Sequence, residues 1–226
     1  MKIFHSHRWD VSLEQAGKIQ VELSKYLVLK DSFEKMEKIA GVGIIFSLAE
    51  DEIIVTLILY SYPELKLLEK IAKQSKVNFP YRSGFFAFSC GPAILSCLER
   101  IEIPDLMIFP GRGIYHPRKL GLASHLGVLL NLPTIACSKT PLWNINEDVD
   151  SRKGAYIIKN QGSARIGAVL RSKENTKPIF ITPGHKVSVK KSVEIILKCC
   201  FQYRLPDPLR EAAILTKHFK ESKKVE

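Results

Sequence analysis

The apolar positions of the chain recur in two patterns, one typical of helices and one typical of strands. Between Ser12 and Leu29 they follow one helical face, and Ser12 is placed as the N-cap. Two runs rich in β-branched residues, 39–48 and 52–60, flank the acidic turn 49–51 and predict an antiparallel hairpin. We expect a third strand over 65–76, although this segment fits a helix equally well.

The second half of the chain alternates helical and strand patterns. We expect a helix over Gly91–Glu102, opening with Pro92 in its first turn, and then a short buried strand over 105–109 that ends at Pro110. A glycine-containing loop then leads into a helix that ends near residue 130. Further strands are expected at 132–139, 155–159, 164–172 and 178–184, and further helices at 188–201 and 208–220.

This order of elements is that of the ribonuclease H-like α/β fold: three strands, helix, strand, helix, strand. We therefore expect a mixed sheet flanked by helices. No repeat, low-complexity tract or long linker divides the chain, so we expect a single domain over residues 1–226.

Composition narrows the class of protein. With 46% hydrophobic residues, the 226-residue chain can bury an ordinary core, which excludes disorder. The excess of 34 Lys and Arg over 23 Asp and Glu gives a net charge of +11, which favours a polyanionic partner, nucleic acid before an acidic membrane. Five cysteines without a C-x-x-C pair do not indicate a disulfide framework or a zinc site. Since no apolar stretch is long enough to cross a membrane, we expect a soluble, cytoplasmic protein.

Three loops concentrate glycine, proline and polar side chains: 79–84, 110–118 and 182–186. The last two follow predicted strands, so we expect them to converge on one cleft. Gly111 and Gly113 would let a ligand approach the backbone and offer N–H groups to a base edge or phosphate. They fit ordinary turns with positive φ equally well.

Tyr81 is the loop aromatic best placed to stack on a base, although a packing role is the common alternative. Several cations lie in or next to the same loops and would focus the positive charge there, although each fits a solvated surface role as well: Arg112, Arg118, Lys119, Lys139 and Lys186. The histidines at 116, 125 and 185 share no metal-ligand spacing. Common nucleotide-binding, zincin and hydrolase motifs are absent from the sequence.

Several motifs resemble those of one nuclease family, endonuclease V. They run from Arg8-Trp9-Asp10 and Ile39-Ala40-Gly41-Val42, through Pro80-Tyr81 and the specific block His116-Pro117-Arg118-Lys119-Leu120-Gly121-x-Ala123-Ser124-His125, to Pro183-Gly184-His185 and Tyr203-Arg204-Leu205-Pro206-Asp207-Pro208. The family cuts near deoxyinosine in DNA and, in some members, inosine in RNA. The resemblance implies magnesium-dependent phosphodiester cleavage, a loop that wedges into the duplex, and a pocket for the flipped base.

The resemblance also implies four metal ligands, three carboxylates and one Asp or His, and none of them is present. The corresponding positions hold Gly43, Cys90, Pro110 and Ala213. Magnesium prefers oxygen ligands, and no neighbouring acid is placed to substitute. We therefore expect no metal and no other cofactor, with magnesium only if cleavage persists.

Binding features of the family persist in the sequence. Tyr81 matches the wedge tyrosine, while Arg82 departs from the usual sequence after it. Lys139 matches a lysine near the scissile phosphate. The remaining expected nucleic-acid-binding residues are Gly84, Gly111, Arg112, Gly113, Ile114, His116, Arg118, Ser124, His125, Gly184 and His185.

The leading hypothesis is a nucleic-acid-binding pseudo-nuclease, with DNA or RNA as partner and inosine or a distorted base as a candidate target. One alternative is an active deoxyinosine endonuclease of DNA repair that uses a relocated site. Another is a module that binds a protein or small ligand in the old cleft. We expect no membrane partner and favour a monomer.

Overall fold

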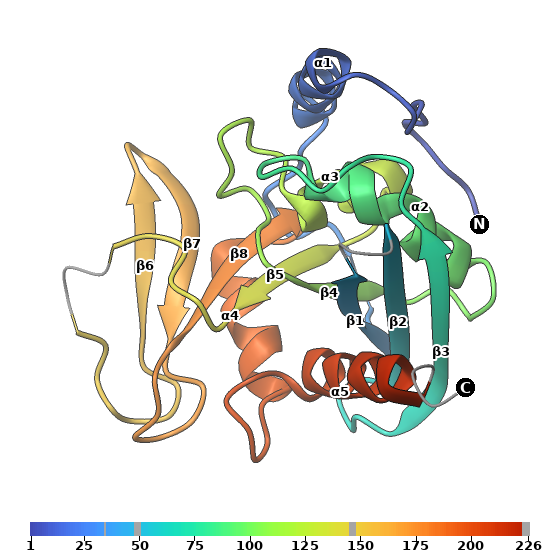
Figure 1. Ribbon diagram of the computed structural model, residues 1–226. Coiled ribbons are helices and arrows are strands. Elements are labelled where there is room, and N and C mark those ends of the chain that lie inside the picture. The colour runs from blue at the N-terminus through green and yellow to red at the C-terminus, as the bar shows by residue number, and fades with distance from the viewer. Residues whose placement is uncertain (34, 48–50, 145–147, 223–226) are drawn as a thin grey trace.

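The core of the computed structural model is a mixed sheet with the strand order β3-β2-β1-β4-β5-β8-β7-β6 (Figure 1). The structure describes residues 1–33, 35–47, 51–144 and 148–222. The strands are β1 (Lys38–Ser47), β2 (Glu52–Ser61), β3 (Leu67–Lys76), β4 (Leu106–Pro110), β5 (Thr134–Ser138), β6 (Tyr156–Gln161), β7 (Ala164–Leu170) and β8 (Ile179–His185). Strands β1, β4 and β5 run parallel, and the other neighbouring strands pair antiparallel. The expected ribonuclease H-like sheet is confirmed.

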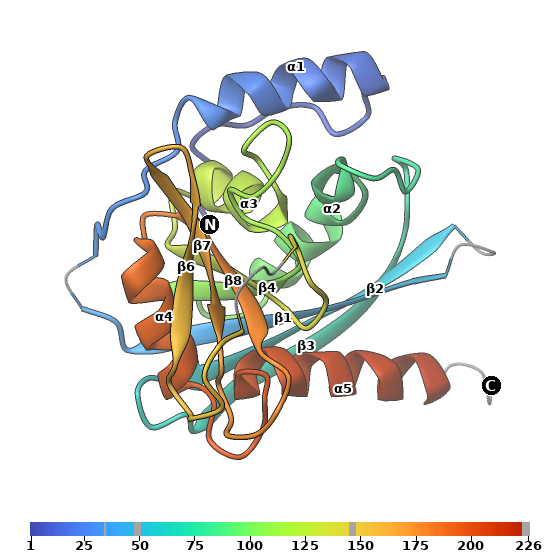
Figure 2. The ribbon, with the colours of Figure 1, turned by 90° about the vertical axis from the view of Figure 1, so that its left-hand side faces the viewer.

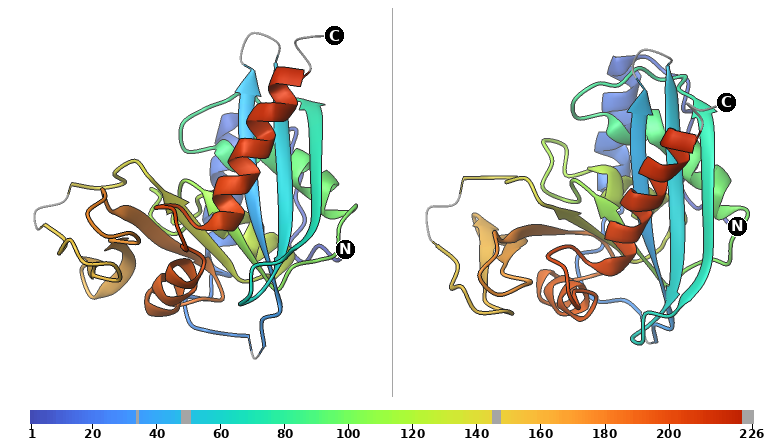
Figure 3. Two further views of the ribbon diagram at one scale, coloured as in Figure 1. Left: turned by 90° about the horizontal axis from the view of Figure 1, so that it is seen from below. Right: turned by 60° about the horizontal axis from the view of Figure 1, so that its bottom comes forward.

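Helices cover both faces of the sheet. They are α1 (Leu13–Ser24), α2 (Phe86–Leu98), α3 (Leu122–Leu130), α4 (Val189–Lys198) and α5 (Asp207–Ser222). Helices α2 and α3 lie on one face and α5 on the other, and α1 packs outside α3 (Figure 2). Seen from below, α5 runs along β1 and β2 (Figure 3), with which it makes most of its contacts.

Side chains alternate along β1, so they contribute to two hydrophobic clusters, one on each face of the sheet. Ala40 and Val42 belong to the cluster under α2 and α3, whereas Ile39 belongs to the cluster under α4 and α5. The face of β1 that meets α5 carries Gly41 and Gly43. A Cβ at Gly41 would lie 2.6 Å from the backbone nitrogen of Leu209, so α5 packs directly on the β1 backbone.

The predicted hairpin of β1 and β2 is confirmed, with Lys38 opposite Ser61 and Ser47 opposite Glu52. Residues 49 and 50 of the predicted acidic turn lie outside the described residues. The ambiguous third segment is the edge strand β3, not a helix. Its pairing places Ile71 opposite Leu57, and exposed lysines along it suit the edge of a sheet.

The predicted start of the helix at Gly91 is wrong. Helix α2 begins five residues earlier, at Phe86, and Pro92 lies inside it. The first turns contain Ala87, Phe88 and Cys90, which are buried against the core. This burial stabilises helix on the N-terminal side of the proline, even though a proline removes one backbone donor.

Helix α1 is shorter than predicted but is capped as expected. The Ser12 hydroxyl accepts a hydrogen bond from the Gln15 backbone, and the Gln15 side chain accepts one from Ser12 N. This reciprocal pair is a capping box. The chain leaves the helix after Ser24, so Leu27 and Leu29 lie in the connector to β1.

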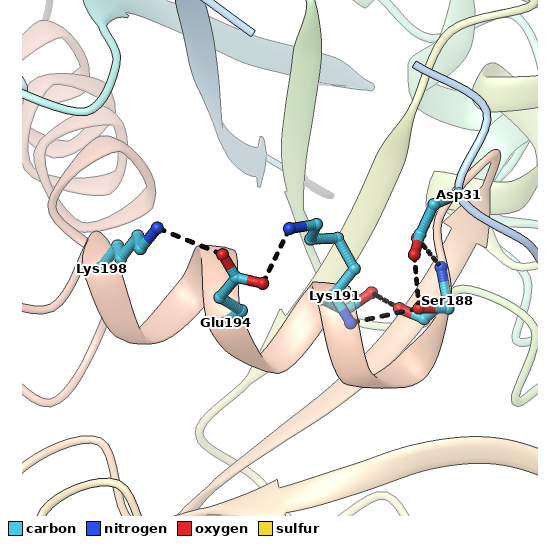
Figure 4. A network of polar contacts seen from close by, with 6 residues as sticks. Asp31, Ser188, Lys191, Glu194 and Lys198 are labelled. Atoms are coloured by element: carbon cyan, nitrogen blue, oxygen red, sulfur yellow. Dashed lines mark hydrogen bonds and ion pairs between the residues drawn. The ribbon is translucent and has the colours of Figure 1, made fainter. Parts of the chain in front are cut away.

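The connector between α1 and β1 is fastened to the N-terminus of α4. The Asp31 carboxylate accepts hydrogen bonds from Ser188 N, at 2.7 Å, and from Ser188 Oγ, at 3.1 Å (Figure 4). The Ser188 hydroxyl in turn caps α4 by accepting from Lys191 N. On the same helix, Glu194 pairs with Lys191 and Lys198.

Strand β8 continues through His185, so the predicted strand over 178–184 is confirmed, and the overlapping loop prediction of 182–186 is wrong for most of its length. Antiparallel pairing places His185 opposite Thr134, at the start of β5, and therefore away from the carboxyl ends of β4 and β5. The described residues form no helix long and apolar enough to span a membrane.

Candidate functional site

A cavity of about 290 Å³ opens beside the carboxyl end of β4. Three segments form it: α1, the loop before α2 with the first turn of α2, and the loop between β4 and α3. Its volume is near the lower end of small-molecule sites, roughly 300–1,000 Å³. The lining residues are Gln20, Tyr81, Arg82, Ser83, Gly84, Phe86, Ala87, Gly111, Arg112, His116, Leu120, Gly121 and Leu122.

Tyr81 presents an aromatic ring at the edge of this cavity. The residue is 51% exposed, and its ring rests edgewise on Phe46 and Phe86, with centroids 5.4 and 5.9 Å away. The two phenylalanines hold the tyrosine ring in place while one side remains open. Such a ring can stack on a planar ligand without first being ordered.

The Gly84 carbonyl fixes the loop that carries Tyr81. It accepts hydrogen bonds from Gln20 Nε2 and His116 Nε2, each at 3.0 Å, and from Arg118 Nη2 at 3.1 Å. Arg118 also donates through Nε to Gln20 Oε1 at 2.5 Å and stacks on the Phe85 ring. The guanidinium of Arg118 is therefore engaged in holding the loop.

Gln20 was not among the sequence-predicted site residues, although the sequence carried a signal for it. The buried face of α1 consists of Ala16, Gln20 and Leu23, so a polar side chain occupies a position where the helical period calls for an apolar one. A buried amide needs partners, and here they come from the two loops of the cavity.

His116 is a neutral hydrogen-bonding group in this site. Its Nε2 donates to Gly84 O and its Nδ1 accepts from Arg118 N, which fixes the tautomer. Burial lowers the pKa of His116 to about 4, and the charges of Arg118 and Arg112 act in the same direction.

Of the two interpretations of Gly111 and Gly113, N–H groups free for a ligand or ordinary turns, the first is wrong. Gly111 N donates to Cys137 O, Gly113 N donates to Thr182 Oγ1, and Ile114 N donates to Pro183 O. A Cβ at Gly113 would overlap Pro183, so this glycine allows close packing of the loop on β8. Gly111 lines the cavity with φ +93°, and a Cβ there would meet nothing within 4 Å, so its left-handed backbone and not close packing calls for glycine.

Four further predicted residues lie away from the cavity lining. Ser124 and His125 are fully buried in α3, and His125 Nε2 lies 2.7 Å from His7 Nε2. Gly184 packs on Thr134, and His185 Nδ1 accepts from Val28 N in the α1–β1 connector. From the third predicted loop, Thr182 and Pro183 contact the glycine loop.

Exposed cations flank the same end of the sheet. Arg112 projects from the glycine loop with its guanidinium 5.8 Å from the Tyr115 ring centre, and Lys139 directly follows β5 with its side chain in solvent. Arg82 is exposed on the Tyr81 loop. These three cations remain available to a polyanion.

Strands β1 and β4 part beside this site. Their pairing ends at Gly41 and Ile108, after which β1 continues with β2 and β4 continues with β5. Gly43 and Pro110 each lie two residues beyond the last pair. Both positions therefore lie where β1 and β4 separate, which we call the split. Neither residue offers an oxygen ligand from its side chain.

The other two expected metal positions, Cys90 and Ala213, offer no oxygen ligand from their side chains either. Cys90 is fully buried on the α2 side of the sheet, its Sγ donates to Phe86 O, and burial raises the pKa of its thiol far above the usual range. Ala213 is exposed on α5. Among the described residues, no group of three or more His, Cys, Asp or Glu side chains could hold a metal ion. The residues present do not fit a magnesium site.

The sheet order, the helices on both faces and the site at the end of β4 define a protein of the ribonuclease H-like class. The family model of endonuclease V matches residues 21–214. Endonuclease V of Dictyoglomus thermophilum is 40% identical over 211 residues, which cover 93% of this chain and 91% of that protein. The chain belongs to the endonuclease V family.

Solved structures agree with this assignment. The endonuclease V structure from Bacillus subtilis superposes with a TM-score of 0.90 at 27% identity and covers 99% of each chain. Endonuclease V of Ciona intestinalis, solved with a 24mer DNA that contains an inosine followed by a ribo-adenosine, has a TM-score of 0.81 at 26% identity. It covers 95% of this chain and 99% of the Ciona chain.

Proposed function

We propose that the protein binds nucleic acid at the cavity edged by Tyr81 and does not cleave the phosphodiester backbone. One observation carries this proposal: the cavity and its supporting hydrogen bonds are intact, while the four positions that would hold the metal offer glycine, a buried thiol, proline and alanine. Loss of all four metal ligands removes the means to polarise a phosphate and to activate water.

Nucleic acid is the partner class that the site favours. The net charge is +11, and Arg82, Arg112 and Lys139 stand exposed near the cavity. A tyrosine ring supported by two phenylalanines suits stacking on a base, and the Ciona relative was solved with inosine-containing DNA. Inosine in DNA or RNA is therefore the first target to test.

The test combines binding and cleavage on the same labelled oligonucleotides. The panel consists of a duplex with one deoxyinosine, the same duplex without it, the corresponding single strands, and an RNA with one inosine. Fluorescence anisotropy in EDTA and in Mg²⁺ measures binding, and denaturing gels with Mg²⁺ or Mn²⁺ and excess protein measure nicking. We expect binding in both buffers, preference for inosine, and no nicking.

Tyr81→Ala is the variant that ties binding to the cavity. Base stacking contributes roughly 1–3 kcal/mol, so this variant should bind about tenfold more weakly. Tyr156→Ala removes a comparably exposed tyrosine from β6 and is the matched control. Metal-dependent nicking would establish the active-endonuclease alternative, and failure to bind any nucleic acid at low salt would favour a protein or small-molecule ligand.

A further inference from the structure

Three oxygen atoms fill the space between β1 and α5 at the point where the sheet splits. They belong to the hydroxyls of Thr56 on β2 and Thr216 on α5, and to the carbonyl of Ala212 on α5. All three residues are fully buried. We refer to this group as the threonine clasp.

The clasp is closed by short hydrogen bonds. Thr56 Oγ1 lies 2.7 Å from both Ala212 O and Thr216 Oγ1, and Thr216 Oγ1 lies 2.6 Å from Ala212 O. Two hydroxyl protons and three acceptor oxygens meet here, so each hydroxyl can donate within the group. Both hydroxyls are therefore satisfied within the group, which ties α5 to β2.

The clasp also takes the space that a side chain at position 43 would need. A Cβ built on Gly43 would overlap Thr216 Oγ1, Thr56 Oγ1 and Ala212 O. The third of these atoms is helix backbone, so relief requires movement of α5 and not only a change of rotamer. At Gly111, on the other side of the split, a Cβ would meet nothing within 4 Å.

We infer that the threonine clasp has closed the metal position at residue 43 by fastening α5 onto β1 and β2. The inference rests on the proposed loss of cleavage and adds a physical cause for it: the site lacks room as well as ligands. Restoring the four ligands alone will therefore give weak metal binding, and tight binding requires that the clasp be opened as well.

The first test compares two reconstructed proteins. One carries Gly43→Asp, Cys90→Glu, Pro110→Asp and Ala213→His, and the second adds Thr56→Ala and Thr216→Ala. Calorimetric titration with Mn²⁺ measures binding, and the protein with only the two threonine substitutions is the control. We expect binding at least tenfold tighter in the six-substitution protein, and none in the control. Equal Mn²⁺ affinity in the two reconstructed proteins would overturn the inference.

A smaller thermodynamic cycle tests the clasp if the reconstructed proteins do not fold. Gly43→Ala is introduced into the parent chain and into the Thr56→Ala, Thr216→Ala chain, and melting temperatures are compared. We expect the alanine to lower the melting temperature less in the chain with the open clasp, because α5 can then move. An equal or larger loss there contradicts the inference, as does failure of both alanine proteins to fold.

These outcomes are separate from those of the proposed function. Nicking of inosine DNA by the parent chain would disprove the proposed loss of cleavage. It would not affect the Gly43→Ala experiment, whose result depends only on melting temperatures. Conversely, an equal effect of Gly43→Ala on the melting temperature in the two chains would reject the inference about the clasp. The proposal that the parent protein binds nucleic acid and does not cut it would still stand.

Discussion

At the scale of single residues, Gln20 links three parts of the cavity. Its side-chain amide donates to Gly84 O and Leu120 O and accepts from Arg118 Nε, and the residue is 1% exposed. We expect Gln20→Leu to cost roughly 1–3 kcal/mol of unfolding free energy, because it leaves buried polar groups unpaired. Urea denaturation measures this, with Gln202→Leu on the exposed surface as control. Equal losses in the two variants would contradict the role given to Gln20.

Buried histidines make stability depend on pH. Burial lowers the pKa of His185 to about 4 from an ordinary 6.5, and the neighbouring charge of Lys186 adds to the effect. The unfolded chain therefore takes up the proton first, so the stability is complete above pH 6.5 and is lost as the pH falls from 6.5 toward 4. Each such histidine contributes a slope of at most about 1.4 kcal/mol per pH unit.

We expect the unfolding free energy of the parent protein to fall between pH 7 and pH 5, and His185→Gln to make that fall shallower. Urea denaturation at several pH values gives the slope. His218→Gln changes an exposed histidine on α5 and is the matched control. A parent protein whose stability rises toward pH 5 would show that the sign is wrong.

The site residues differ in how far the sequence could predict them. Tyr81, Gly111, Arg112 and His116 lie at the cavity as their loop motifs indicated. The sequence could not show that the Gly113 amide is used by Thr182, because that bond depends on the loop folding back over β8. Nor could it show the clasp, because Thr56 and Thr216 are 160 residues apart in the chain.

At the scale of elements, two helical glycines should respond oppositely to the same substitution. A Cβ at Gly17 in α1 would meet nothing within 4 Å, so Gly17→Ala should stabilise the protein by about 0.5–1 kcal/mol. A Cβ at Gly91 in α2 would lie 2.5 Å from the Trp9 ring, so Gly91→Ala should destabilise it by roughly 1–3 kcal/mol. Urea denaturation of the two variants provides the comparison, and changes of the same sign would contradict it.

The elements themselves were largely predictable, and their boundaries were less so. The strands and the later helices follow from the two apolar periods. The start of α2 was missed because Pro92 usually marks a first turn, whereas here tertiary burial of Phe88 and Cys90 extends the helix past it. The nature of β3 was undecided because pairing with β2, not its own pattern, determines it.

At the scale of the whole molecule, individual cations that contribute to the net charge of +11 can be placed relative to the cavity. Lys139 and Arg112 are exposed at the end of the sheet that carries the cavity. Lys66 is exposed in the connection between β2 and β3, at the opposite end of the sheet. If nucleic acid binds at the cavity, cations near it release counterions from phosphates and distant cations do not. The salt dependence of binding can therefore distinguish a localised interface from general attraction.

We expect the logarithm of the binding constant to fall linearly with the logarithm of salt concentration, with a slope of about −0.9 for each phosphate contact on duplex DNA. Lys139→Gln and Arg112→Gln should each reduce that slope by about 1, whereas Lys66→Gln, which removes the same charge, should leave it nearly unchanged. Fluorescence anisotropy at a series of salt concentrations measures all three slopes. If Lys66→Gln reduces the slope as much as the other two, the charge acts over the whole surface and the interface is not at the cavity.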